Sequence, residues 1–320
     1  MADLLDDPRA PDPVGRRGNV RIGTCSWSDP SLIKTKAFYP RGTGTTEKRL
    51  RYYATQFPIV EVDSSFYAMP VPQNSVLWAE RTPANFVFNV KAFRLLTGHH
   101  TPAQVFPPDI AAVLPPLSGR TRSYYYESLP AELRDELWRR FIEALAPLKD
   151  ANKLLAVHFQ FAPWATNSRE WRSHVEECVQ QMAGHLLSVE FRNATWLSEP
   201  NVARTLAWLR ELGVAHTVVD GPQGVGNYAH AVWEVTNPKL AVVRLHGRNA
   251  ESWNMKGLRA SSERFNYEYT EAEFDELSAA IDGLAARALE VVALLNVNHE
   301  DQGVRAARAL INRQQRLTGE

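Results

Sequence analysis

The sequence predicts an α/β protein built as a parallel (β/α)8 TIM barrel, with long loops after the third and seventh strands. Short runs rich in Val, Ile, Leu and Phe recur along the 320 residues, and each is closed by polar residues. Segments with helical periodicity lie between most of these runs, an alternation that is typical of the barrel. An open doubly wound sheet with a small cap is the alternative, but no GxGxxG or GxxxxGKS/T motif follows any run.

Eight strands and seven helices are predicted in alternation. The strands are expected at residues 20–24, 59–63, 86–91, 154–161, 186–192, 214–220, 240–246 and 291–298. The helices are expected at residues 47–57, 73–80, 131–148, 168–182, 201–212, 271–289 and 302–315. The connection between the sixth and seventh strands shows no clear helical pattern. Surplus length lies at residues 94–130 and 247–270, after strand carboxyl ends, where such barrels place the loops that shape their sites.

Composition indicates one globular domain at residues 19–320, after a dispensable lead-in at residues 1–18. Thirty-six basic and 36 acidic residues give zero formal charge, so a nucleic-acid partner would need a local basic patch. Cys25 and Cys178 lack the number and spacing for a disulfide framework or a structural zinc site, which favours a reducing compartment. No apolar run is long enough for a membrane span, so we expect a soluble, cytoplasmic protein. Nothing in the sequence indicates the oligomeric state.

Polar and apolar residues alternate along the predicted strands. Side chains at i and i+2 share one face of a strand, and in a barrel one face meets the helices while the other points into the lumen. Charged residues gather on the second face, near the strand carboxyl ends: Glu61, Asp63, Lys91, Glu190, Arg192, Asp220, Arg244 and His246. Unpaired buried ions are costly, so these groups either bind a ligand or form ion pairs that close the barrel, such as Glu190 with Arg244 or Asp63 with Lys91. We expect a ligand site.

These residue types suit the capture and conversion of a small anionic or polyhydroxylated substrate. Glu190 is the expected general acid or base, with Glu61 and His246 as further catalytic residues. The expected substrate-binding residues are Lys91, Arg192, Arg244, Arg248, Asp220, Trp27, Tyr67 and Trp196. His99 and His100 lie in the long loop after the third strand, from which they could extend over the mouth of the barrel, its open end at the strand carboxyl ends.

A metal ion is the alternative use of the carboxylates. No cofactor is expected, but a single Mg2+ or Mn2+ on Glu61, Asp63, Glu190 or Asp220 would suit their oxygen ligands. Histidines are too few in suitable places for a polynuclear zinc site.

A series of motifs in fixed order carries a family resemblance. They are IGTCSW at 22–27, FYP at 38–40, YYATQFPIVEVDSSFYAMP at 52–70, RTPANFVFNVKAFRLLT at 81–97, FQFAP at 159–163, SVEFRNATW at 188–196, VRLHGR at 243–248 and a closing LLNVNHEDQGVRAARAL. From about residue 20 onward the chain resembles the YecE-like family, which implies a TIM barrel and no established reaction. FQFAP stands where a double-proline QFPP is common, and NVNHEDQG replaces the usual paired Asn, which leaves roles for Asn298 and His299 open.

Three functions are consistent with this pattern. The leading hypothesis is an enzyme, a hydrolase, isomerase or lyase, that binds its small substrate at the carboxyl end of the barrel. A metal-dependent phosphodiesterase, by analogy with endonuclease IV, is the first alternative, and it requires several carboxylates and His246 around one cation. A ligand-binding module without catalysis is the second.

Overall fold

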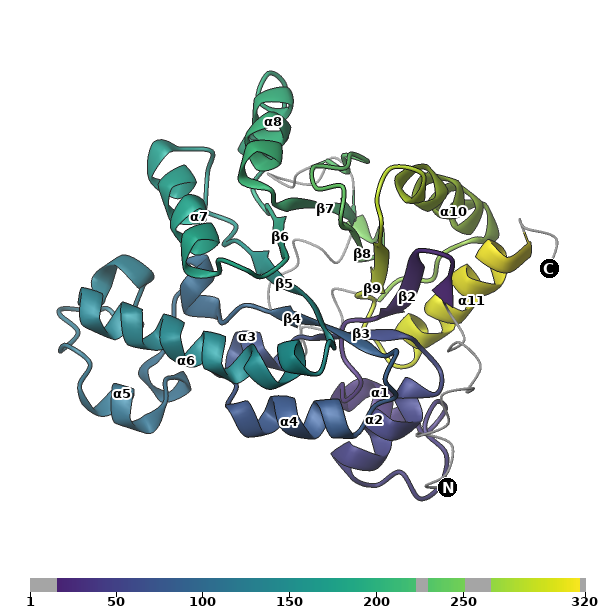
Figure 1. Ribbon diagram of the computed structural model, residues 1–320, viewed down its shortest axis with the longest axis horizontal. Helices are drawn as coiled ribbons and strands as arrows, with labels where there is room; N and C mark the ends of the chain where they lie inside the picture. The colour runs from purple at the N-terminus through teal and green to yellow at the C-terminus, as the bar shows by residue number, and fades with distance from the viewer. Residues whose placement is uncertain (1–15, 223–229, 251–265, 317–320) are drawn as a thin grey trace.

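Nine strands form one sheet in this computed structural model, which describes residues 16–222, 230–250 and 266–316. They are β1 (Arg16–Arg17), β2 (Val20–Thr24), β3 (Ile59–Val62), β4 (Val87–Lys91), β5 (Leu154–Gln160), β6 (Leu187–Glu190), β7 (Ala215–Asp220), β8 (Ala241–Leu245) and β9 (Val291–Leu295). Strands β2 to β9 are parallel and follow one another in chain order, and the pairing of β9 with β2 closes the barrel (Figure 1). The predicted (β/α)8 TIM barrel is therefore confirmed. β1 pairs antiparallel with β2, so residues 16–17 of the expected lead-in belong to the sheet.

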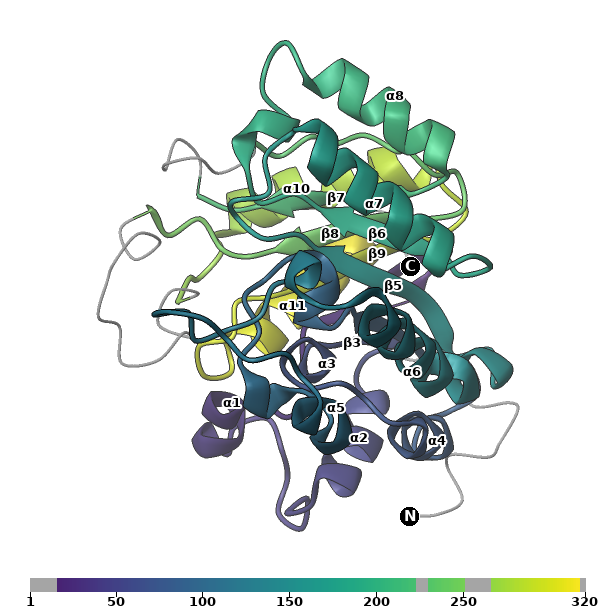
Figure 2. The same cartoon turned by 90° about the vertical axis from the view of Figure 1, so that its left-hand side faces the viewer.

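Helices surround the strands (Figures 1 and 2). They are α1 (Pro30–Thr35), α2 (Thr46–Ala54), α3 (Ser64–Tyr67), α4 (Pro72–Glu80), α5 (Pro108–Ala112), α6 (Ala131–Asp150), α7 (Arg169–Gln181), α8 (Val202–Leu212), α10 (Glu271–Ala285) and α11 (Gln302–Arg316). The seven predicted helices are confirmed within a few residues at each end. Sequence periodicity did not reveal α1, α3 and α5, because six residues or fewer hold too little of the helical repeat.

Side-chain caps fix where several of these helices begin. The hydroxyl oxygens of Thr45, Ser168 and Thr270 each accept a hydrogen bond from a backbone N–H in the first turn of α2, α7 and α10. Glu273 completes a capping box at α10 by accepting from the backbone of Thr270. Such caps satisfy donors that the helix itself leaves free, so the loops before these helices end at defined residues.

The long third loop contains short helical segments of its own. After β4 come the 3-10 turns η1 (Arg94–Thr97) and η2 (Ala103–Val105), then α5 and a further turn, η3 (Tyr126–Ser128). Another turn, η4 (Ala194–Trp196), follows β6. Of the predicted loop at 247–270, residues 251–265 lie outside the described residues, as do residues 223–229 of the helix-free sixth connection.

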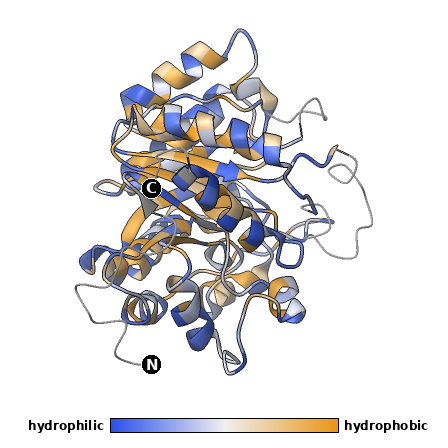
Figure 3. Ribbon diagram, turned by 90° about the vertical axis from the view of Figure 1, so that its right-hand side faces the viewer, coloured by the Kyte–Doolittle hydropathy of each residue, from blue (hydrophilic) through white to orange (hydrophobic). Residues whose placement is uncertain are grey.

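Apolar side chains pack on both faces of the barrel strands, the face toward the helices and the face toward the lumen. Helix-facing strand residues such as Val60, Phe88 and Val243 are fully buried. A second apolar cluster lies in the lumen: Cys25, Ile59, Val87, Ala156, Ala215, Leu240, Val242, Val292 and Leu294. Most of these residues lie toward the strand amino ends, although Leu294 is paired in register with Arg244. In Figure 3 the strands inside the molecule are largely hydrophobic, whereas the surrounding helices combine hydrophobic and hydrophilic residues. The polar lumen residues Glu61, Glu190 and Arg244 instead lie near the carboxyl ends of their strands. Within the described ranges, no helix is both long and apolar enough to cross a membrane.

Candidate functional site

Polar side chains that face the lumen lie above this apolar floor, toward the strand carboxyl ends. The strand register aligns Glu61 with Asn89 and Gln160 with Glu190. Seven of the predicted site residues meet here: Glu61, Asp63, Lys91, Glu190, Arg192, Arg244 and His246. We call these seven residues the central cluster.

Arg244 on β8 links the two fully buried carboxylates of the central cluster. Its Nη2 lies 2.7 Å from Glu61 Oε1, and its Nη1 lies 2.6 Å from Glu190 Oε2. Nη1 also donates to Gln160 Oε1 at 3.2 Å. Two ion pairs expected of a ring that closes the barrel, Glu190 with Arg244 and Asp63 with Lys91, are therefore both present.

Glu190 at the end of β6 is surrounded by cations and imidazoles. Its Oε1 accepts from Arg192 at 2.7 Å, and the Nε2 atoms of His158 and His246 each lie 3.6 Å from its Oε2. Burial by itself raises the pKa of Glu190, but Arg244 and Arg192 outweigh burial and hold that pKa well below its usual range. Glu190 is therefore an ionised carboxylate with both oxygens engaged.

Glu61 on β3 is held in the same way. Its Oε1 accepts from Arg244, and its Oε2 accepts from Asn89 Nδ2 at 2.9 Å. Burial raises the pKa of Glu61, but the charges of Arg244, His158 and Lys91 outweigh burial and lower it to about 2. Glu61 is thus a structural counter-ion for Arg244 within the barrel.

His246 follows β8 and is fully buried. Asn296 Nδ2 lies 2.7 Å from its Nδ1, so Nδ1 accepts and Nε2 carries the proton toward Glu190. Burial is the main reason that the pKa of His246 falls to about 4. His246 is therefore a neutral imidazole at pH 7.

Only part of the central cluster reaches the solvent. Asp63, just past β3, has 27% of its side chain exposed and accepts from Lys91 Nζ at 2.7 Å. Arg192, two residues past β6, has 15% exposed. Lys91 is buried, with its Nζ 4.3 Å from the centre of the Phe66 ring. The part of the central cluster nearest the solvent therefore combines one carboxylate, Asp63, with the cations Lys91 and Arg192. We call these three residues the upper layer.

Arg94 and His99 join this upper layer from the third loop. The guanidinium of Arg94 lies 5.5 Å from the centre of the same Phe66 ring, and the His99 ring packs edge-to-face on it at 4.9 Å. Burial and then the charges of Lys91, Arg94 and Arg192 lower the pKa of His99 to about 3. His99 was expected over the mouth from its position in the third loop, whereas Arg94 was not among the predicted site residues. The available signal was its position three residues beyond the third strand.

Asp220 and Arg248, both predicted to bind substrate, form a separate cluster beside α10. Asp220 Oδ1 lies 2.8 Å from Arg248 Nη2, and Asp220 Oδ2 accepts from the Tyr269 hydroxyl at 2.8 Å. Burial raises the pKa of Asp220 even though Arg248 opposes that change. Arg248 also pairs with Glu276 at 2.9 Å. These contacts tie the end of β7 to α10.

The three predicted aromatic residues have different surroundings. Tyr67 is 54% exposed and remains accessible at the end of α3. Trp27 is buried and packs edge-to-face on Trp78, with ring centres 6.0 Å apart. Trp196 is fully buried, stacks on Phe191 at 4.0 Å and donates from Nε1 to a backbone carbonyl. The structure therefore places Trp27 and Trp196 in the core rather than at the mouth.

The carboxylates of the central cluster do not fit a Mg2+ or Mn2+ site. Among the described residues, no group of three or more His, Cys, Asp or Glu side chains is arranged to hold a metal ion. All four carboxylate oxygens of Glu61 and Glu190 already accept hydrogen bonds from guanidinium or amide groups. A cation would have to displace Arg244 from both.

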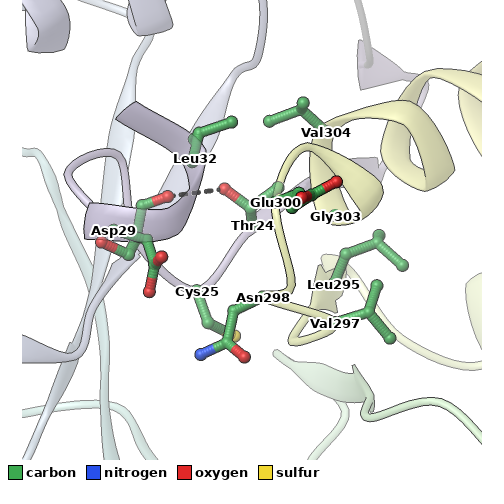
Figure 4. Close-up of a pocket in the computed structure, with 11 residues that line it drawn as sticks. Thr24, Cys25, Asp29, Leu32, Leu295, Val297, Asn298, Glu300, Gly303 and Val304 are labelled. Carbon is green, nitrogen blue, oxygen red and sulfur yellow. Dashed lines mark hydrogen bonds between the residues drawn. The ribbon is translucent and has the colours of Figure 1, made fainter. Parts of the chain in front are cut away.

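A small crevice lies between the ends of β2 and β9 (Figure 4). Cys25, Asn298 and Gly303 are among the residues that line it, and its volume is about 20 Å³, room for one water molecule. Burial raises the pKa of the Cys25 thiol well above its usual range, so the thiol stays protonated. The crevice is too small for a substrate.

Comparison with known proteins agrees with the motifs. The family model described as "Protein of unknown function DUF72" matches residues 21–319. The UPF0759 protein YunF of Bacillus subtilis (strain 168) is 31% identical over 282 residues, which cover 87% of this chain and 89% of that protein.

Solved structures of DUF72 proteins share the fold. One from Enterococcus faecalis V583 has a TM-score of 0.74 at 25% identity, covering 92% of this chain and 95% of that chain. Another, from Thermotoga maritima MSB8, has a TM-score of 0.68 at 24% identity, covering 94% and 99%. These matches confirm the resemblance to the YecE-like family. The chain therefore belongs to the DUF72 family of proteins of unknown function.

Proposed function

We propose that the barrel mouth binds a small anionic substrate and that the protein is an enzyme acting on it. Three cations, Lys91, Arg94 and Arg192, lie close enough to His99 to lower its pKa. Side chains of this kind bind carboxylate and phosphate groups through charge-assisted hydrogen bonds. This charge distribution favours an anion at the open end of the barrel.

Arg94 is the observation that carries the proposal. Lys91 and Arg192 each have a carboxylate partner, whereas Arg94 forms no ion pair within the residues the structure describes. Its Nε is buried without a hydrogen-bond partner, and its Nη2 lies 3.4 Å from His100 Nε2. Burial lowers the pKa of Arg94. An anionic ligand would supply the missing counter-charge and the missing acceptor.

The buried carboxylates Glu61 and Glu190 position arginine side chains rather than exchange protons with a substrate. Glu61 and Glu190 are ionised, sealed from solvent and fully engaged. They hold Arg244 and Arg192 in place as positioning residues. Asp63 is the partly exposed carboxylate of the central cluster, so we assign the proton transfer to Asp63.

Replacing Arg94 by Ala is expected to weaken the binding of inorganic phosphate at least tenfold, because a charge-assisted hydrogen bond contributes about 1.5 to 3 kcal/mol. Isothermal titration calorimetry of the whole chain with phosphate, sulfate and malate measures this effect. Arg308→Ala is the matched control. Arg308 lies on α11, away from the barrel mouth, and like Arg94 its guanidinium lies over an aromatic ring, here that of Phe38. The proposal is wrong if no anion binds, or if Arg94→Ala binds anions as well as the wild type does.

The Asp63→Asn variant separates catalysis from binding. It removes a negative charge beside Lys91 and leaves the cations in place, so phosphate should bind as tightly as before or more tightly. Turnover of a ligand recovered from cell extract should fall at least a hundredfold, as expected for loss of a general acid or base. Mass spectrometry of the ligand before and after incubation provides the readout. A ligand that the wild type returns unchanged would instead identify a binding module.

A further inference from the structure

A second pocket opens on the barrel rim, beside the mouth, and the proposed function does not use it. Its volume is about 510 Å³, and its lining residues are Tyr125, Glu127, Trp164, Glu170 and Trp171. They come from the end of the third loop, from the loop after β5 and from the first turn of α7. We call these five residues the rim pocket.

Two of the aromatic rings in the rim pocket are unusually accessible for their size. Trp164 is 45% exposed and Tyr125 is 42% exposed. Their ring centres lie 6.4 Å apart with the planes at 75°, so they form two walls that meet at nearly a right angle. Trp171 adds a third aromatic side chain. Burying such rings against a ligand would be favourable.

The backbone next to the rim pocket holds Trp171 in place. Gly98 has a φ of +74°, and a Cβ built there would lie 2.2 Å from Trp171 Cη2. The indole therefore packs directly on a glycine that no other residue can replace without strain. The ring of His174 contacts Trp171 edge-to-face at 5.8 Å. Trp171 is thus fixed before any ligand arrives, which reduces the entropy cost of binding.

The rim pocket carries two acidic side chains that are not neutralised by ion pairs. Glu127 and Glu170 are exposed, and neither pairs with Lys or Arg in the described part of the chain. Elsewhere the protein places its own cations over aromatic rings, as Arg134 lies over Tyr126 at 5.1 Å and Arg172 lies over Trp208 at 4.8 Å. In the same described ranges, no Arg or Lys covers the three rings of the rim pocket.

We infer that the rim pocket is a binding site for an organic cation, with an alkylammonium group against the three aromatic rings and near both carboxylates. The negative faces of indole and phenol rings attract such cations, and desolvation in a cage of several rings strengthens the attraction. The carboxylates add a charge of the correct sign. Trp164 also contacts His99 and His100, at 5.7 and 6.1 Å, so the cation site adjoins the anion site without sharing its charged residues.

Choline and its uncharged isostere 3,3-dimethylbutan-1-ol provide the test. Both have the same shape, so any difference in affinity reports the charge. We expect the whole chain to bind choline at least fivefold more tightly than the isostere, measured by ligand-observed NMR. Trp164→Ala should weaken choline binding at least tenfold, and circular dichroism confirms that the variant folds. If choline and the isostere bind equally well, or neither binds, the inference is wrong.

A pair of charge variants completes the test. Glu127→Gln/Glu170→Gln should weaken choline binding at least threefold and leave the isostere unaffected. Glu132→Gln/Glu211→Gln makes the same change in net charge at other exposed positions and should leave choline binding unchanged. Equal effects of the two double variants would overturn the inference. Arg94→Ala should bind choline normally, so failure of the anion site and failure of the cation site are distinguishable.

Discussion

Replacing Arg244 by Met is expected to lower the free energy of unfolding by about 3 to 5 kcal/mol. Met has a similar length, so it fills most of the volume of the guanidinium stem and creates little cavity. The loss comes from Glu61 and Glu190, which are fully buried and would lose the guanidinium that both of them share. Urea unfolding at pH 7, followed by circular dichroism, measures the change.

Arg305→Met is the matched control for this substitution. Arg305 also pairs with a glutamate, Glu268, but both side chains are more than half exposed, so its loss should cost less than about 1 kcal/mol. Adding Glu61→Gln and Glu190→Gln to Arg244→Met should restore part of the lost stability, because the uncompensated charges are then gone. A cost for Arg244→Met as small as that of the control would mean that water reaches the two carboxylates.

Lowering the pH from 4.5 to about 2 is expected to remove about 3 kcal/mol of stability through Glu61 alone. Burial raises the pKa of Glu61, but Arg244, His158 and Lys91 bring it from 4.5 down to about 2 in the folded protein. Between these two values the unfolded chain binds a proton that the folded chain does not. Stability is therefore complete above the unfolded pKa and falls as the pH falls through this window. Glu190 acts in the same direction.

The Glu61→Gln variant identifies this contribution. Its free energy of unfolding at pH 7 should be lower than that of the wild type, and the difference should shrink as the pH approaches 2. Denaturant unfolding at half-unit pH steps measures both curves. Parallel curves for the two proteins between pH 4.5 and 2 would show that Glu61 has an ordinary pKa in the folded state.

Local sequence patterns predicted the barrel and the lumen face of most strands, but Asp220 on β7 was expected in the lumen and instead pairs with Arg248 beside α10. The strand residues Glu61, Asn89, Glu190 and Arg244 all face the lumen, because alternation along a strand depends only on the local backbone. Strand ends were less certain. β6 ends at Glu190, so Arg192 lies in the following loop.

Side chains beyond the strand ends were harder to place from sequence. Trp27 and Trp196 both follow strand ends, as Tyr67 and Trp164 do, yet the first two are buried and the others are exposed. Whether a loop turns its aromatic side chain inward depends on the elements that pack against it, such as Trp78 and Phe191. Arg94 was missed for the same reason, because its approach to Phe66 requires the fold of the third loop.

The (β/α)8 architecture and most of the charged residues that face the lumen follow from local patterns in the sequence, because strand periodicity and the alternation of strands with helices depend only on the order of residues along the chain. Tertiary structure decided which of these charges face solvent and which neutralise one another. The sequence favours Glu190 as the general acid or base and indicates Asp63 only as a metal ligand or a partner of Lys91. In the structure Glu190 lies deep between Arg244 and Arg192, while Asp63 lies partly exposed at the mouth. The pairing of buried ions depends on distances between strands far apart in the chain, and those distances exist only once the barrel has closed.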